Sequence, residues 1–278
     1  MVIDFHTHVF PPQITKNRSK YAESDPCFAL LYSNPKAKMA TAEELIASMD
    51  EDGVDVSVIA NYGWATQRLC VEINDYILES VARYPKRLVG FCAVQPNSGE
   101  AAMAEIERSV RGGAKGIGEL RPDLQKFDFL NEQVTPLIEL IGKNKLIMLI
   151  HADEPAGHAY PGKGSVTPNV LYPFIARFPH LTIVCAHWGG GLPFYALMPE
   201  VKKAMANVFF DTAASPFLYS SQIYSQAVQL VGGEKVLFGS DYPLLKQRRL
   251  LNEINSSSLP DDIKNLILSG NAQRLLGI

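Results

Sequence analysis

The chain has 278 residues, of which 47% are hydrophobic and 20% charged, with a formal net charge of −3. This length fits a single α/β barrel, which commonly has about 250 residues, and the composition provides a large buried core. The lack of a basic block argues against nucleic acid as a partner, and no apolar run is long enough to span a membrane.

Eight short apolar runs are predicted strands, and they alternate with longer segments of helical periodicity. In chain order the predicted strands are residues 2–8, 54–61, 87–94, 114–119, 146–151, 181–187, 207–212 and 235–241. Residues 41–52 open with the T-x-x-E pattern of a capping box and end at Gly53, and residues 98–111 end at a glycine pair, so both are predicted helices. The alternation predicts an α/β fold with a parallel sheet. We expect a closed (β/α)8 TIM barrel, with an open doubly wound sheet as the alternative.

The chain shows no linker tract and no internal repeat, so we expect one domain over residues 1–278. Residues 9–40 form a long connection that contains four prolines and several basic residues. So long a loop in a compact domain is more often functional than a plain connector. We expect residues 9–40 to be a lid-like insertion over the site.

The first predicted strand ends in His6-Thr7-His8. Strand side chains alternate, so His6 and His8 are expected on the same side, a few ångströms apart. Two neighbouring imidazoles suit a metal ion such as Zn, Mn or Fe. An isolated H-x-H pair is at least as often a chance pair at a surface strand end.

Five of the eight predicted strands end in potential metal ligands, and the carboxyl ends of barrel strands are where barrel enzymes carry their chemistry. These residues are His6 and His8, Glu119, His151, His187 and Asp241. Taken singly, each residue could have a purely structural role. His151 or His187 could be a hydrogen-bonded histidine at a strand end, Glu119 could pair with Arg121, and Asp241 could cap a turn. Together they favour a metal site, because a polar side chain after an apolar run is costly unless something satisfies it.

The pattern resembles the amidohydrolase superfamily, and more narrowly the family 2 branch with aminocarboxymuconate semialdehyde decarboxylase and γ-resorcylate decarboxylase. The resemblance covers almost the whole chain and rests on the motifs DFHTH, GIGELRP, IH, AHWGGG, LFGSDYP and LSGNAQRLLGI. It implies a metal held by His6, His8, His151 and Asp241. It also implies that His187 is either a further ligand or a catalytic group.

Glu119 departs from this branch. The mononuclear decarboxylases do not as a rule use a strand 4 carboxylate, whereas TatD-like and phosphotriesterase-like relatives use a strand 4 Glu or carboxylated Lys to bridge two metals. Glu119 would complete a two-ion site; alternatively it orients a ligand or pairs with Arg121. We leave the number of ions at one or two and expect zinc, with manganese or iron as alternatives.

Four residues are candidate substrate contacts. Arg121 has the planar fork that binds carboxylates, although an internal salt bridge is an equal alternative. Tyr62 and Trp64 follow the second predicted strand and would wall an aromatic or unsaturated substrate, or simply pack against neighbours. His158 lies in the loop after the fifth strand, where a surface position is the alternative. The glycines after His187 would let backbone approach the site closely.

The expected activity is metal-dependent hydrolysis of a small carboxylate-, ester-, lactone- or amide-bearing molecule by activated water. Asp241 would accept and pass on the proton, while His187 or the metal would stabilise the oxyanion. The alternative is non-oxidative decarboxylation of an unsaturated or aromatic carboxylic acid, with Asp241 or His187 protonating the carbon. One bound ion would favour decarboxylation and two would favour hydrolysis. A third interpretation is a protein that binds a metal without catalysing a reaction. It is disfavoured because metal ligands at strand ends beneath a lid indicate a site that is accessible to a substrate.

Cysteine usage indicates a reducing compartment. The chain begins without the basic and apolar segments of an export signal, and its four cysteines lie far apart. We expect a cytoplasmic protein in which Cys92 and Cys185 are buried inside strands. The oligomeric state is left open, with a homodimer as one alternative.

Overall fold

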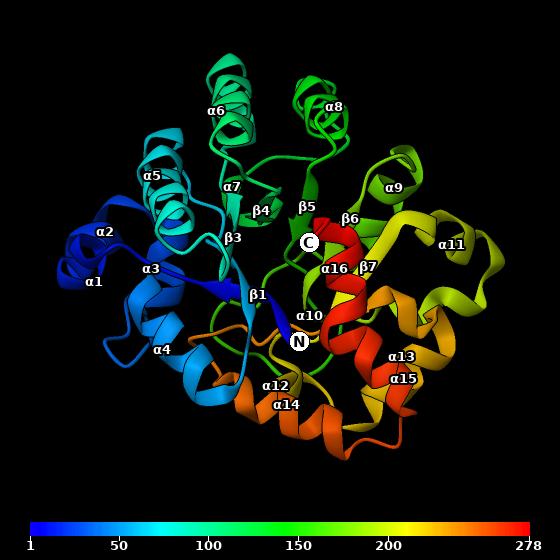
Figure 1. Cartoon of the computed structure of the whole chain (residues 1–278). Helices are drawn as coiled ribbons and strands as arrows, with labels where there is room; N and C mark the ends of the chain where they lie inside the picture. The colour runs from blue at the N-terminus through cyan, green and yellow to red at the C-terminus, as the bar shows by residue number, and fades with distance from the viewer.

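The computed structural model describes residues 1–278 and contains one sheet of eight parallel strands, ordered β1 to β8 as in the chain. The strands are β1 (Ile3–His8), β2 (Val56–Ala60), β3 (Leu88–Cys92), β4 (Gly116–Leu120), β5 (Ile147–Ile150), β6 (Ile183–Cys185), β7 (Val208–Asp211) and β8 (Val236–Leu237). The sheet closes where the His8 N–H donates to the Tyr242 carbonyl at 2.7 Å and the Asp241 N–H donates to the His6 carbonyl at 2.9 Å. The predicted (β/α)8 barrel is therefore confirmed, and the open sheet is not found (Figure 1).

Helices surround the barrel. They are α4 (Ala42–Asp52), α5 (Gln67–Arg83), α6 (Glu100–Arg111), α7 (Pro122–Gln125), α8 (Thr135–Lys143), α9 (Pro168–Arg177), α10 (Ala186–Gly189), α11 (Pro199–Ala204), α12 (Ser215–Leu218), α13 (Gln222–Val231), α14 (Gln247–Ser256), α15 (Asp261–Asn265) and α16 (Asn271–Leu276). The predicted helix over 41–52 is confirmed. Thr41 and Glu44 form the capping box, and Gly53 ends α4 at a left-handed φ of 73°. The helix predicted from residue 98 begins at Glu100, because Pro96–Ser98 form a 3-10 turn.

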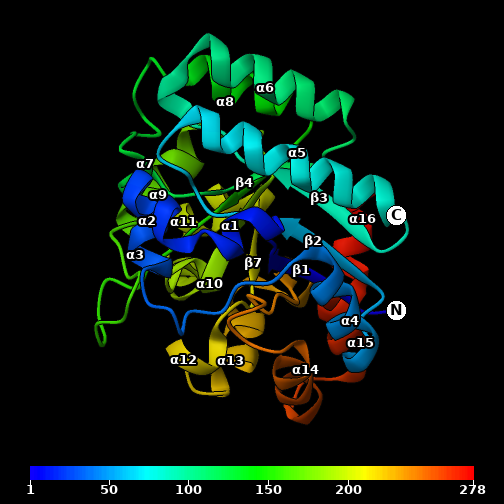
Figure 2. The same cartoon turned by 90° about the vertical axis from the view of Figure 1, so that its left-hand side faces the viewer.

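Two apolar layers hold the barrel together. The interior is filled by side chains such as Phe5, Val58 and Leu149, and the larger layer lies between the strands and the helices. Leu276 of α16 packs on the interior layer. Figure 2 shows α16 on the side of the molecule where both termini lie. The expectation for Cys92 and Cys185 is confirmed, since both are buried in strands and free.

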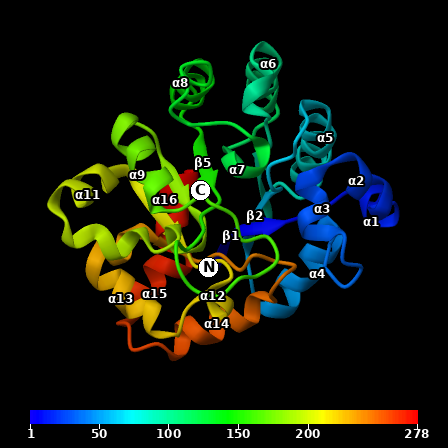
Figure 3. The same ribbon diagram turned by 180° about the vertical axis from the view of Figure 1, so that it is seen from behind.

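The segment 9–40 is not a bare loop. It folds into three short helices, α1 (Pro12–Lys16), α2 (Arg18–Ser24) and α3 (Pro26–Tyr32). Asp25 accepts hydrogen bonds from the N–H groups of Phe28 and Ala65, both at 2.9 Å, and so ties α3 to the loop after β2. Figure 2 shows α1 to α3 on the side of the molecule away from both termini. Figure 3 shows the barrel from this end, with α3, α7 and α12 around its axis.

No helix combines the length and the apolar composition that would be needed to cross a membrane.

Candidate active site

Strands β1 and β4, which carry His6, His8 and Glu119, are irregular next to these residues. The β1–β2 register shifts between Asp4 and Thr7, and the β4–β5 register shifts between Ile117 and Leu120. Such a bulge re-aims the side chains that follow it and is common beside active sites. In β1 it separates Asp4, which accepts a hydrogen bond from Gln247 of α14, from His6, which points into the site.

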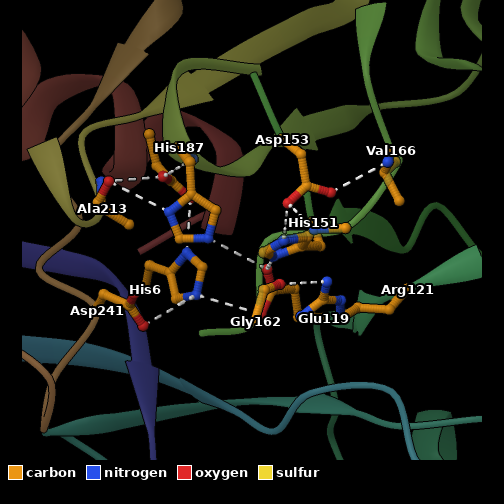
Figure 4. Close-up of polar contacts among 12 residues, drawn as sticks. His6, Glu119, Arg121, His151, Asp153, Gly162, Val166, His187, Ala213 and Asp241 are labelled. Carbon is orange, nitrogen blue, oxygen red and sulfur yellow. Dashed lines mark hydrogen bonds and ion pairs between the residues drawn. The ribbon is translucent and has the colours of Figure 1, made fainter. Parts of the chain in front are cut away.

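His6, His8, Glu119 and Asp241 form one group of donors. Figure 4 shows His6, Glu119 and Asp241 of this group. The Nε2 atoms of His6 and His8 are 3.0 Å apart. Asp241 Oδ1 lies 3.2 Å from His8 Nε2 and 3.9 Å from His6 Nε2. Glu119 Oε2 lies 3.6 Å from His8 Nε2 and 3.7 Å from His6 Nε2. The two histidines of β1, a carboxylate from β4 and a carboxylate from the segment after β8 therefore converge.

The second oxygen of Glu119 faces another histidine pair. Oε1 lies 2.7 Å from His151 Nδ1 and 3.5 Å from His187 Nε2. The alternative in which Glu119 pairs with Arg121 is not found. Arg121 instead donates from Nη2 to the Gly162 carbonyl at 2.8 Å. Glu119 thus stands between two groups of imidazole donors.

Asp211 at the end of β7 fixes two of the histidines. Its Oδ2 lies 2.8 Å from His6 Nδ1, and its Oδ1 accepts from the N–H groups of His187 at 2.9 Å and Ala213 at 3.1 Å. The Ala213 carbonyl lies 3.2 Å from His187 Nδ1 and can only accept, so that nitrogen carries a proton. Because Asp211 and the Ala213 carbonyl hold the Nδ1 atoms of His6 and His187, the Nε2 atoms of both rings are directed at Glu119.

Asp153 holds the imidazole of His151 in place, as Asp211 does for His6. Its Oδ1 lies 3.1 Å from His151 Nε2, while Gly164 and Val166 donate backbone N–H groups to the same carboxylate. Partners of this kind set the tautomer and orientation of metal-binding histidines. His8 differs, because its buried Nδ1 has no hydrogen-bond partner.

Sequence reasoning missed Asp153 and Asp211. A signal was available, since Asp211 lies near the end of the seventh predicted strand and Asp153 lies two residues after His151. Asp153 does not follow the end of an apolar run as directly as the candidate ligands do.

The charges of the cluster favour a bound cation. Burial raises the pKa of Glu119, but His151 and His187 outweigh burial and hold that pKa well below its usual value. Burial lowers the pKa of His187, yet Glu119 and Asp241 outweigh it and raise that pKa to about 9. Ionised carboxylates thus face imidazole nitrogens at the bottom of a cleft. Imidazole and carboxylate donors suit Zn, Mn or Fe, so the residues fit a divalent metal.

The backbone at the site is unusual. His187 and Asp241 adopt left-handed φ angles of 54° and 64°. Such angles are uncommon outside glycine and cluster at functional sites. The glycines after His187 allow the close approach that the sequence suggested, because a Cβ on Gly190 would lie 2.1 Å from the Asp153 carbonyl oxygen.

A cavity of about 520 Å³ opens over the cluster. Its floor includes His8, Glu119, His151, His187 and Asp241. Part of its wall comes from the insertion, through Leu30, Leu31, Tyr32, Asn34, Lys36, Ala37 and Lys38. Three of the four candidate substrate contacts, Tyr62, Arg121 and His158, line it. Trp64 does not. Its indole is fully buried, stacks on Phe28 at 5.4 Å between centroids and donates to Asn61 Oδ1 at 2.9 Å.

Comparison with curated proteins relates the chain to decarboxylases. It is 23% identical to 2-amino-3-carboxymuconate-6-semialdehyde decarboxylase of Dictyostelium discoideum, over 99% of this chain and 91% of that protein. It is 22% identical to γ-resorcylate decarboxylase of Polaromonas sp. strain JS666, over 82% of this chain and 84% of that protein.

Two solved structures share the fold of this chain. The 5-carboxyvanillate decarboxylase of Sphingomonas paucimobilis superposes with a TM-score of 0.83 at 20% identity, covering 100% of this chain and 99% of that one. A dihydroxybenzoic acid decarboxylase of Polaromonas sp. JS666, solved with manganese and 2-nitroresorcinol, gives a TM-score of 0.74 at 18% identity, covering 99% and 96%.

These relatives contradict the expected hydrolase activity and favour the alternative, decarboxylation. The expectation failed because metal ligands at strand ends serve either reaction, so the ligand pattern alone does not separate them. The sequence matches the amidohydrolase family over residues 3–278. The chain therefore belongs to the amidohydrolase family.

Proposed function

We propose that this protein is a divalent-metal-dependent, non-oxidative decarboxylase of a small aromatic or unsaturated carboxylic acid. The observation that carries the proposal is the end-to-end similarity to two curated decarboxylases, 99% and 82% of this chain being covered. It is supported by a metal-type donor cluster on the floor of a cavity of about 520 Å³, a size suited to a small ligand.

The group of His6, His8, Glu119 and Asp241 would hold the ion. Glu119, His151 and His187 form a second group of the same donor types. A bound divalent ion would supply a Lewis acid that neutralises and orients the oxygens of the acid. Manganese is the ion of choice for loading, because a decarboxylase of the same fold was solved with it.

The residues of the chain account for the remaining steps. Tyr32, Tyr62 and Phe217 line the cavity and would stack against or exclude water from a planar substrate. The bond to the leaving carboxylate breaks, carbon dioxide departs, and the electron pair stays on the ring or alkene carbon. That carbon then takes a proton. We assign its delivery to His187, whose Nδ1 is held by the Ala213 carbonyl while Nε2 faces the cluster, rather than to Asp241.

We assign residues 9–40 the role of a lid. Leu31 and Tyr32 of α3 line the cavity, and Gly162 packs so closely on Leu31 that an added Cβ would lie 2.6 Å from it. The insertion and the loop after β5 thus meet at the cavity. Exclusion of water there would protect the carbanion-like carbon until it is protonated by a side chain.

The test is a screen of the manganese-loaded protein against aromatic and unsaturated carboxylic acids, with carbon dioxide release as the readout. Turnover in D2O should place one deuterium on the carbon that lost the carboxylate. Protein treated with chelator is the control. Cleavage of esters or lactones without release of carbon dioxide from any acid would contradict the proposal.

A further inference from the structure

Asp4 on β1 is a buried carboxylate to which the proposed reaction gives no role. None of the residue is exposed, and it does not line the cavity. Its Oδ1 accepts from the backbone N–H groups of Ser240 at 2.9 Å and His6 at 3.2 Å. Its Oδ2 accepts from Ser240 Oγ at 2.5 Å and Gln247 Nε2 at 2.9 Å. Because donors occupy both oxygens, the carboxylate is held in one orientation.

Ser240 carries this contact past Asp241. The Ser240 hydroxyl donates to Asp4 and accepts from the Tyr242 N–H at 3.0 Å. Ser240 and Tyr242 are the two neighbours of Asp241 in the chain. The Asp241 N–H itself donates to the His6 carbonyl at 2.9 Å. The backbone on both sides of Asp241 is therefore tied to β1 through the carboxylate of Asp4.

Asp241 needs this support because of its backbone conformation. Its φ is 64°, in the left-handed region, which is unfavourable for a residue with a Cβ and persists only where the surroundings impose it. That conformation places Asp241 Oδ1 3.2 Å from His8 Nε2. The segment also packs directly on β1, because a Cβ on Gly239 would lie 2.9 Å from the Cβ of His6. A shift of the segment would therefore move Asp241 relative to both histidines.

Gln247 of α14 contacts the same carboxylate without contacting the segment around Asp241. Its Nε2 donates to Asp4 Oδ2 and, at 3.3 Å, to Ser57 Oγ, while its buried Oε1 has no hydrogen-bond partner. Loss of this side chain would leave the hydrogen bonds between Asp4 and Ser240 in place. Gln247 thus provides a comparison between stability and positioning at one carboxylate.

We propose that Asp4 is a positioning residue of the candidate metal site. Through Ser240, its carboxylate holds Asp241 in the left-handed conformation that directs Oδ1 at His8. The inference deepens the proposed function and rests on it, because it takes Asp241 as a ligand of the bound ion. It assigns Asp4 no contact with the substrate.

Asp4→Asn and Ser240→Ala break the link at different points. The amide of Asp4→Asn has one acceptor oxygen, which can serve the backbone N–H groups or the side-chain donors but not both. Ser240→Ala removes the hydrogen bond to Asp4 Oδ2 and the one from the Tyr242 N–H. We expect each variant to weaken Mn²⁺ binding by about 10-fold or more, the scale found when outer partners of metal ligands are changed.

Two readouts separate positioning from a loss of stability. Calorimetry measures the Mn²⁺ affinity, and the ¹³C chemical shifts of Asp241 in the metal-free protein report its backbone conformation. Both variants should move these shifts away from the values of a left-handed residue. Burial raises the pKa of Asp4 to about 6, so measurement at about pH 8 keeps the carboxylate ionised.

Gln247→Met is the matched control. It removes a hydrogen bond from the same buried carboxylate and should lower the free energy of unfolding, with the Mn²⁺ affinity and the Asp241 shifts unchanged. Ser240→Ala decides the test if Asp4→Asn does not fold. Wild-type Mn²⁺ affinity or wild-type Asp241 shifts in the folded variants would overturn the positioning role, as would an equal loss of affinity in Gln247→Met. If the wild type binds no Mn²⁺, the proposed metal-dependent function fails, and the Asp241 shifts of the metal-free protein alone decide the role of Asp4.

Discussion

Asp211→Asn should invert the tautomer of His6, a candidate metal ligand, while leaving the fold in place. In the wild type, Asp211 Oδ2 accepts from His6 Nδ1 at 2.8 Å, so the lone pair of His6 is on Nε2, facing His8 and Glu119. The amide that replaces this carboxylate could keep its oxygen for the two backbone N–H groups that Oδ1 now accepts. Its NH₂ group would then face Nδ1, which could only accept, and the His6 proton would move to Nε2.

The expected changes in stability and in metal affinity follow from the interactions that Asp211→Asn removes. The fold loses one charge-assisted hydrogen bond, about 1.5–3 kcal/mol, which a domain of this size should survive. The site loses the lone pair of one ligand, and outer partners of metal-binding histidines typically change metal affinity by about 10–100-fold.

Three measurements check this prediction. Calorimetry with Mn²⁺ gives the affinity, and denaturant unfolding gives the stability. Burial lowers the pKa of His6, but the Asp211 and Glu119 carboxylates outweigh burial and hold that pKa well above its usual value, so ¹⁵N spectra of the metal-free protein recorded above that pKa give the His6 tautomer. Asp261→Asn, whose side chain is 97% exposed, is the matched control. Wild-type metal affinity in Asp211→Asn, with the His6 proton still on Nδ1, would refute the reasoning.

Four further predictions concern the cluster. Glu119→Gln should weaken Mn²⁺ binding at least about tenfold, because one oxygen of Glu119 faces the His6–His8 pair; unchanged affinity would place Glu119 outside the ligand set. Metal analysis of the wild type should give one equivalent, whereas two would make His187 a ligand and pass proton delivery to Asp241. Asp241→Asn should weaken Mn²⁺ binding by about 10-fold or more and reduce turnover accordingly without unfolding the protein, because an amide replaces one of the carboxylates that would hold the ion; near-normal Mn²⁺ affinity would exclude Asp241 from the ligand set. Chelation should abolish activity and lower the melting temperature, since at a metal concentration of about 100 Kd the bound ion contributes about 2.7 kcal/mol; an unchanged melting temperature would contradict tight binding.

The architecture was predictable from local patterns. Apolar runs at regular intervals located all eight strands, because strand formation and burial depend on local composition and alternation. The helix over 41–52 was predicted to within a residue, since its capping box and terminal glycine are local signals. The ligand candidates were found too, as polar residues that interrupt apolar runs. The last strand was overestimated: only Val236–Leu237 form a strand, which pairs with β7, and the chain then turns toward Asp241.

How these residues act depends on contacts between distant segments. His6 and Asp211 are 205 positions apart, and no local pattern pairs them. The division of Glu119 between two histidine pairs depends on a register shift in β4, and the burial of Trp64 away from the cavity depends on α3 packing beside it. The choice between hydrolysis and decarboxylation was also beyond the ligand pattern, because a reaction is set by the groups that surround the substrate above the metal. Those groups come from segments that are far apart in the chain, and only folding brings them together around the cavity.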